Sequence, residues 1–216
     1  PTQVFDKYRL FELKTTAAHG VWLEDEDMQI LKERSVTVVN NPVSNLKLAS
    51  GVAPVKEMLD FEINVALGTD GMASNNSNDL FEEIKFASLI QKNRCKDTTV
   101  LSAYEALKMA TVNGALAQRR EKESGKLEVG YDADLVVLDF RNPRQMACYD
   151  YMDNIAFACT GKDVVLTMCQ GNILYENGEH KTIDIERVLY EADRIVNGFK
   201  DFNRNRMEGD ISEENV

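Results

Sequence analysis

The chain has few of the residues that usually hold metal ions or form disulfides. Its 216 residues include two histidines, His19 and His180, and four cysteines with no Cys-x-x-Cys pair. That cysteine spacing argues against a zinc knuckle and favours reduced thiols in a cytoplasmic protein. Two histidines are also too few to complete an ordinary zinc site, so we expect any metal site in this chain to be partial.

Long apolar runs and an excess of basic residues are also missing. No apolar stretch approaches the ~20 residues needed to cross a bilayer, and the N-terminus lacks the basic and apolar regions of a signal peptide, so we expect no membrane association. The formal net charge of −11 would repel a phosphate backbone, which argues against nucleic-acid binding. Small molecules or proteins are therefore the expected partners.

The chain does have a hydrophobic content of 44%, enough to bury a substantial core in one domain or one and a half. In its first part, three units of an apolar strand followed by a helix succeed one another. The strands are expected at 15–18, 36–39 and 64–67, and the helices over 25–34, 54–59 and 78–93. Such a succession with short connections predicts an α/β fold with a parallel sheet.

Polar residues follow each of these three predicted strands. His19, Asn45 and Asp70 come after the first, second and third strand. The carboxyl ends of parallel strands lie at one edge of a sheet, where chemistry gathers in such folds. The third helix is expected to turn an apolar face toward the core, made of Leu80, Ile84, Ala87 and Leu89.

The pattern changes in the second half of the chain. Two further helices are expected over 102–109 and 112–118, and a second region begins near Gly125. Its short apolar runs, separated by turn residues, predict a small non-parallel β-sheet at 134–138, 164–168 and 172–175. Helical spacing returns over 183–199, and 208–216 form an acidic tail that we expect to fray. The predicted parts are thus 1–124, 125–182 and 183–216.

Asp70 is the most informative single residue. The apolar run at 64–67 delivers its carboxylate into the loop Gly68-Thr-Asp-Gly-Met-Ala-Ser-Asn-Asn-Ser77, and a carboxylate at a strand end can hold a metal ion or a catalytic water. A lone aspartate after a strand more often forms a turn or caps a helix. The glycine and asparagine residues around Asp70 favour the functional interpretation.

Structural alternatives stay open for several other residues. The alternative for His19 is a hydrogen-bonded structural histidine, and for Asn41-Pro-Val-Ser-Asn45 it is a well-capped turn. His180 follows the turn at 177–179 and is expected at the surface. Trp22 is expected either to line a pocket or to pack in the core.

Four segments stand in a fixed order along the chain, namely Ala17–Leu23, Asn41–Gly51, Gly68–Asn76 and Gly125–Asp139. This ordered set resembles the C-terminal half of metal-dependent amidohydrolases, in the branch of the 5′-methylthioadenosine and S-adenosylhomocysteine deaminases and related chlorohydrolases. The resemblance implies the C-terminal part of a (β/α)-eight TIM-like barrel, strands six to eight, with part of a small β-sandwich and a C-terminal helix.

The resemblance also implies roles for individual residues. Asp70 is similar to the strand-eight aspartate, which ligates the metal and accepts a proton from the attacking water. His19 is similar to the strand-six histidine, which orients or polarises that water and is not usually a metal ligand. The expected substrate-binding residues are Asp70, Ser44 and Asn45, which shape the pocket, and Ser74 and Asn75, which line its rim.

Other parts of the family's site have no counterpart in the sequence. The His-x-His pair of strand one, the strand-five histidine and the proton-shuttling glutamate three residues later are all missing. We therefore expect a C-terminal fragment that is inactive alone, with Asp70 as its one metal ligand and the other ligands outside the chain. Zinc is the expected ion, and iron or manganese are the alternatives.

The function implied by the resemblance is deamination of an adenosine-type purine nucleoside to the inosine product and ammonia. The alternatives are a guanine deaminase, a triazine-type chlorohydrolase and a non-catalytic half-barrel that pairs with another chain. The strands at 15–18 and 36–39 belong to a sheet that further strands should close. An open apolar edge favours self-association, so we expect a homo-oligomer.

Overall fold

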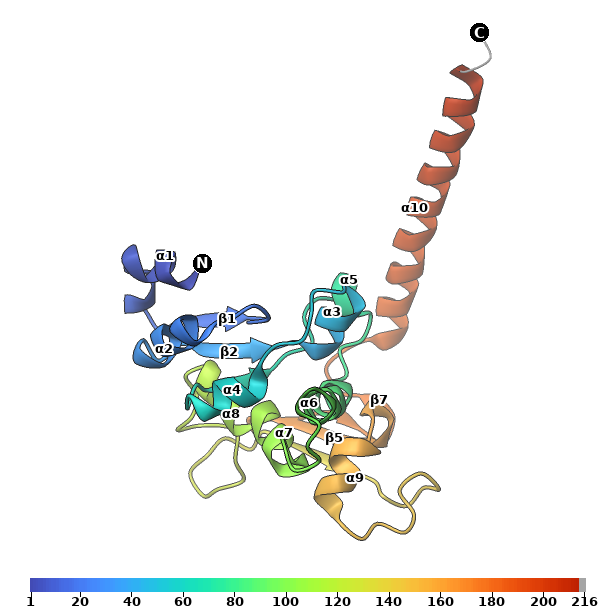
Figure 1. The fold of residues 1–216 in the computed structure, drawn as a ribbon. Helices are drawn as coiled ribbons and strands as arrows, with labels where there is room; N and C mark the ends of the chain where they lie inside the picture. Colours follow the sequence, from blue (N-terminus) through green and yellow to red (C-terminus); the bar gives the residue numbers. More distant parts are fainter. Residues whose placement is uncertain (214–216) are drawn as a thin grey trace.

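The computed structural model describes the backbone of residues 1–213 and the side chains of residues 1–200. Two sheets organise the chain (Figure 1). The first is a parallel sheet of β1 (Thr16–Ala18), β2 (Thr37–Asn40) and β3 (Val65–Leu67), in that order. The second is antiparallel, in the order β4 (Leu135–Leu138), β5 (Val164–Cys169), β6 (Asn172–Glu176) and β7 (Glu179–His180). The predicted parallel sheet and the predicted non-parallel sheet are both confirmed.

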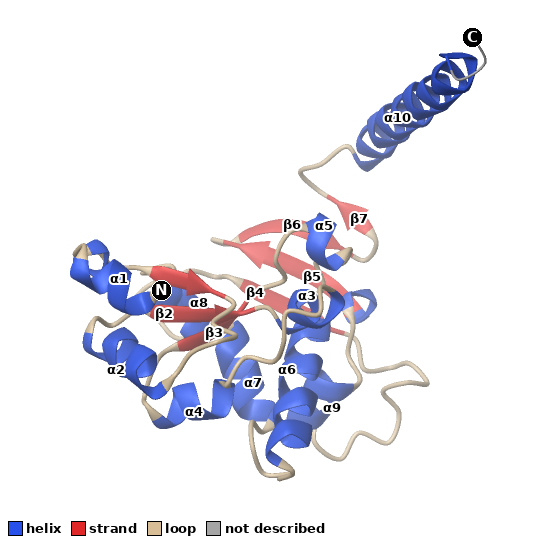
Figure 2. Ribbon diagram, turned by 45° about the horizontal axis from the view of Figure 1, so that its top comes forward, coloured by secondary structure: helices blue, strands red, loops and turns tan. Residues whose placement is uncertain are grey.

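Helices connect the strands and cover the parallel sheet (Figure 2). Before β4 they are α1 (Thr2–Lys7), the 3-10 helix η1 (Leu10–Glu12), α2 (Asp25–Glu33), α3 (Pro42–Lys47), α4 (Val55–Asp60), α5 (Met72–Asn75), α6 (Leu80–Cys95), α7 (Ala103–Ala110) and α8 (Val112–Ala117). After β4 they are α9 (Tyr151–Phe157), the 3-10 helix η2 (Gly161–Asp163) and α10 (Ile185–Glu213). No helix in the described part of the chain is long and apolar enough to cross a membrane.

The core lies between the parallel sheet and helices α2, α4, α6 and α7. Val38 of β2 pairs with Val65 of β3, and both side chains are fully buried. Met58 of α4 and Met109 of α7 fill the space beside them and are also buried. Small and β-branched residues suit strands that helices cover, which explains why these short apolar runs form a parallel sheet.

One predicted core residue is wrong. Ile84 and Ala87 of α6 are buried and Leu80 packs against the core, but Leu89 is 45% exposed. Leu89 lies nine residues after Leu80, which is about two and a half turns of an α-helix, so it points to the opposite side. The buried face of α6 includes the acid Glu83 instead.

Of the two alternatives for Trp22, the structure excludes a place in the core, because the side chain is 81% exposed. Helix α10 projects from the body of the molecule in both views and continues to Glu213, through most of the expected acidic tail (Figures 1 and 2). The last part of that tail, 214–216, lies outside the described residues. His180 is exposed, as expected.

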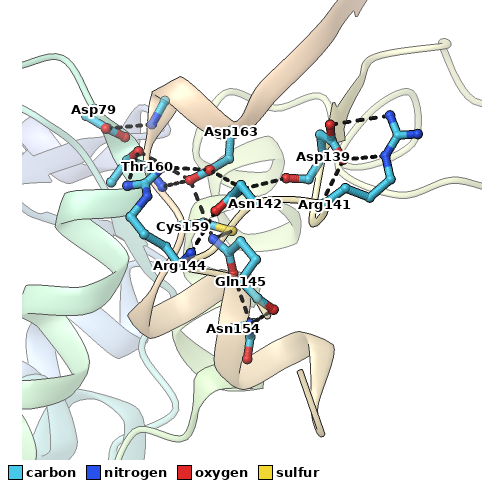
Figure 3. A network of polar contacts seen from close by, with 11 residues as sticks. Asp79, Asp139, Arg141, Asn142, Arg144, Gln145, Asn154, Cys159, Thr160 and Asp163 are labelled. Atoms are coloured by element: carbon cyan, nitrogen blue, oxygen red, sulfur yellow. Dashed lines mark hydrogen bonds and ion pairs between the residues drawn. The ribbon is translucent and has the colours of Figure 1, made fainter. Parts of the chain in front are cut away.

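A buried carboxylate, that of Asp163, holds together the segment between β4 and β5 (Figure 3). Asp163 accepts hydrogen bonds from Arg144 (2.8 Å), Asn142 (3.1 Å) and the backbone N–H of Thr160 (2.9 Å). Next to it, the N–H of Gly161 donates to Asp79, the N-cap of α6 (2.8 Å). The contact between Gly161 and Asp79 joins this segment to the start of α6.

Replacing Asp163 by Asn should destabilise the protein by about 3 kcal/mol in chemical denaturation. An amide has one oxygen, and its NH2 group would face donors that now bond to the carboxylate. Asp153 is the matched control, because it is exposed at the start of α9 and the same substitution there should cost less than about 1 kcal/mol. Equal unfolding midpoints for the two variants would contradict this role of Asp163.

Candidate active site

Parallel pairing places His19 and Asp70 at the same edge of the first sheet. The N–H of His19 donates to Val39 O (2.8 Å), and the N–H of Gly68 donates to Asn40 O (3.0 Å), so pairing continues past β1 and β3. Both His19 and Asp70 then adopt a left-handed backbone, with φ of 69° and 59°. This conformation costs roughly 1 kcal/mol for a residue with a side chain, and it persists where surrounding contacts hold it.

The carboxylate of Asp70 is held by two hydrogen bonds. Ser44 Oγ donates to Oδ2 (2.6 Å), and the N–H of Gly71 donates to Oδ1 (2.7 Å). The Ser44 bond is the largest cause that lowers the pKa of Asp70, followed by the Gly71 bond, while burial acts weakly the other way. Asp70 therefore carries its negative charge at neutral pH, with 29% of its side chain exposed.

The ring of His19 is oriented by Asn45. Its Nδ1 lies 2.8 Å from Asn45 Oδ1, and its Nε2 lies 4.0 Å from Asp70 Oδ2. An amide oxygen only accepts hydrogen bonds, so in this orientation Nδ1 of His19 donates to Asn45 and Nε2 is left facing Asp70. At 4.0 Å, Nε2 and Asp70 Oδ2 face each other without a direct hydrogen bond.

The remaining predicted site residues lie around this pair. Ser44 and Asn45 are buried in α3, and Ser74 adds a small further lowering of the pKa of Asp70. Asn75 is buried, and its amide donates to Thr69 O and to Glu83 Oε1 (both 2.6 Å). The structure therefore brings Ser44, Asn45 and Ser74 close to Asp70 and His19, while Asn75 is engaged within its own loop and with α6.

Three residues that support the candidate site were not predicted from the sequence. Asn41 donates to Val39 O (3.2 Å) and lies 3.5 Å from His19 Nδ1. Gly68 lies against Asn41, because a Cβ there would come within 2.6 Å of Asn41 Oδ1. The third is Glu83, an acid next to Ile84 on the face of α6 that packs on the core. A charged residue on an apolar helix face was the available signal for Glu83.

Asp70 fits one side of a metal site. Its Oδ2 is an ionised oxygen that suits a divalent ion, and His19 Nε2 lies 4.0 Å from it, beside the place expected for a metal-bound water. Zinc takes about four such ligands. Within residues that the structure describes, no group of three or more His, Cys, Asp or Glu side chains is placed to hold an ion.

Replacing Ser44 by Ala should raise the pKa of Asp70, because it removes the largest cause of the lowering. Ser74 to Ala is the matched control and should raise the pKa less. The carboxyl carbon signal of Asp70, followed by NMR against pH, measures both shifts. A lowered folded-state pKa stabilises the fold above the unfolded-state pKa, and this contribution is lost as the pH falls through the folded-state value. An unchanged Asp70 titration in the Ser44 variant would contradict the assignment.

The chain is similar to several known proteins in sequence and in fold. The chain is 46% identical over 212 residues to a protein of Caldanaerobacter subterraneus subsp. tengcongensis named 5-methylthioadenosine/S-adenosylhomocysteine deaminase, covering 98% of this chain and 47% of that relative. The fold of this chain is similar to that of an adenosine deaminase from Xanthomonas campestris with bound zinc. The TM-score is 0.86 at 30% identity, and the match covers 91% of this chain and 45% of the other.

A second solved structure is similar over a somewhat shorter part. It is a mutant of the atrazine chlorohydrolase from Arthrobacter aurescens complexed with zinc and atraton, with a TM-score of 0.78 at 26% identity, covering 84% of this chain and 40% of that one. The chain thus spans about half the length of its relatives. Residues 1–174 match the model of the amidohydrolase family, whose members depend on metal ions. The chain therefore belongs to the amidohydrolase family.

Proposed function

We propose that this chain forms the C-terminal half of the active site of a metal-dependent deaminase. The complete enzyme replaces the exocyclic amine of an adenosine-type purine by water and releases the inosine product and ammonia. The observation that supports this most is the pair of Asp70 and His19 at neighbouring strand ends, each oriented by a residue of α3, Ser44 or Asn45.

Asp70 is the residue of this chain that holds the metal ion. We propose zinc, with iron and manganese as alternatives, because two similar structures contain zinc. A bound divalent ion supplies a Lewis acid that makes water easier to deprotonate. Its other ligands come from outside the described residues, which hold no further cluster of ligand side chains.

Within this chain, the side chains of Asp70 and His19 contact the attacking water. Asp70 Oδ2 accepts a proton from the attacking water, and His19 Nε2, 4.0 Å away, accepts a hydrogen bond from that water and fixes its direction. The bond between His19 Nδ1 and Asn45 keeps Nε2 free to accept. The water oxygen then attacks the carbon that bears the amine. The two protons of the water end on the adjacent ring nitrogen and on the amine nitrogen, which leaves as ammonia; Asp70 returns one of them, and the proton-shuttling glutamate expected outside this chain would move the other.

The substrate is proposed from the relatives. The identity of 46% to the Caldanaerobacter protein exceeds the 26% to the chlorohydrolase, which favours an adenosine-type substrate such as 5′-methylthioadenosine or S-adenosylhomocysteine. Asp70, Ser44, Asn45 and Ser74 are proposed to line its site, and Asn75 to support it. Guanine deamination, triazine-type dechlorination and a non-catalytic half-barrel are the alternatives that the assays below distinguish.

We further propose a homo-oligomer in the cytoplasm. Residues 1–124 supply the end of a barrel, 125–182 part of a β-sandwich, and 183–216 a helix with an acidic end. Apolar side chains exposed along α10 support self-association, among them Val188, Leu189, Ile195 and Phe199. The outer edge of β1 has no partner strand within the described residues, which also favours association.

Metal retention tests the partial ligand set. The chain alone should lose zinc on dialysis, because one carboxylate is too few ligands for tight binding. The chain fused behind the N-terminal half of the Caldanaerobacter relative should keep zinc, measured by elemental analysis. Stoichiometric zinc on the isolated chain, retained after Asp70 is replaced by Asn, would contradict the proposed ligand.

Activity tests the role of Asp70. The zinc-loaded fusion should deaminate an adenosine-type purine, and Asp70 to Asn should lower kcat by about 1000-fold or more, because both a ligand charge and a proton acceptor are lost. Asp25 to Asn, an exposed change in α2, should leave kcat unchanged. Ammonia release measures both.

The same fusion separates the alternatives, with ammonia release measured for guanine and chloride release for a chlorinated triazine. Turnover of guanine or of a chlorinated triazine, with none of adenosine-type purines, would favour those activities instead. A folded, zinc-loaded fusion that acts on none of them would favour the non-catalytic half-barrel.

A further inference from the structure

Glu83 is a buried acid that the proposed chemistry does not use. It lies in the first turn of α6 and is 0% exposed. Its Oε2 accepts a hydrogen bond from the N–H of Val43 (3.2 Å), and its Oε1 accepts one from Asn75 Nδ2 (2.6 Å). Burial raises the pKa of Glu83, and these two hydrogen bonds act against the rise. Each oxygen of the side chain thus accepts one N–H hydrogen bond.

The two donors belong to the two segments that carry the candidate site. Val43 directly precedes Ser44 in α3, and Asn75 follows Asp70 in α5. From the other side, Ser44 Oγ donates to Asp70 (2.6 Å), which links the same two segments a second time. These contacts close a loop of interactions that we call the Glu83 ring, made of Val43, Ser44, Asp70, Asn75 and Glu83.

A third contact between α3 and α5 stabilises their relative position less. Lys47 Nζ donates to Ala73 O (3.2 Å) and to Asn76 Oδ1, but this contact is exposed to solvent. Water can replace the partners of an exposed lysine, so movement there costs little. The partners of Glu83 are buried, and a buried N–H that loses its acceptor costs far more. Glu83 is therefore the contact that resists separation of the two segments.

We propose that Glu83 is a positioning residue, which fixes α3 and α5 so that Ser44 keeps its hydrogen bond to Asp70 and Asp70 keeps its distance to His19. The inference rests on the proposed function, because it assigns Glu83 a part in the same site. Glu83 acts only through its neighbours in the Glu83 ring. A displacement of about 1 Å between reacting groups can slow a reaction by roughly 100-fold.

The first experiment uses the 216-residue chain itself. In Glu83→Gln one buried donor loses its acceptor, because an amide offers one oxygen where the carboxylate offers two. The imidazole nitrogen signals of His19 should then shift in NMR spectra, while those of exposed His180 serve as an internal reference and stay unchanged. Glu82→Gln is the matched control, because it makes the same substitution in the same turn of α6. Among the described residues, no side chain forms a hydrogen bond with the side chain of Glu82.

The second experiment uses the zinc-loaded fusion. Glu83→Gln should lower kcat per zinc by about 10- to 100-fold and change KM by less than about threefold, because the reacting groups are misplaced while the rest of the site still binds. Glu82→Gln should match the parent. Asn75→Ala cuts the Glu83 ring at α5 and should repeat the effect of Glu83→Gln, which provides a second variant if the first does not fold.

Several results would overturn the proposal. Unchanged His19 signals together with an unchanged kcat per zinc would show that the site does not depend on Glu83. A Glu83→Gln fusion with lower thermal stability but the same kcat per zinc as the parent would show that Glu83 supports the fold alone. Loss of folded protein in both Glu83→Gln and Asn75→Ala would show the same. An inactive parent fusion would instead contradict the proposed function, and the His19 signals of the isolated chain would still decide the role of Glu83.

Discussion

In-register parallel pairing of β1, β2 and β3 is the constraint on which the rest of the structure depends. It brings three chain segments that are far apart in the sequence to one edge of a sheet. Hydrogen bonds that continue past the strands fix the backbone of His19 and Gly68, so the side chains that follow have little freedom. Without this pairing, Ser44 would have no fixed position from which to reach Asp70.

Buried polar contacts convert that backbone constraint into side-chain geometry. Ser44 and Asn45 are adjacent in α3, yet one orients a carboxylate and the other an imidazole. Each of these contacts joins segments that follow different strands, so each is long-range in sequence. The Asp163 network does similar work at the second sheet, where a buried carboxylate gathers donors from a long connection (Figure 3). Desolvated carboxylates are costly unless they are well bonded, which gives such contacts a single favoured geometry.

The parts of the molecule that could be predicted from sequence are those determined locally. Apolar runs of strand length and the loop around Asp70 are visible in the sequence, and so is the order of motifs that indicates the family. The burial of Glu83 was not predicted, because an acid in the first turn of a helix is ordinary at an exposed helix start. Only tertiary contact with Val43 and Asn75 makes it part of the site. Leu89 shows the opposite error, since an apolar residue was assigned to the core although the helical period turns it outward.

The most direct measurement is anomalous diffraction at the zinc edge from crystals of the fusion enzyme. We predict one zinc ion about 2.0–2.2 Å from a carboxylate oxygen of Asp70, with a bound water between the ion and His19. A zinc ion that is fully ligated elsewhere, with no zinc bound to Asp70, would contradict the assignment of this strand edge as the active site.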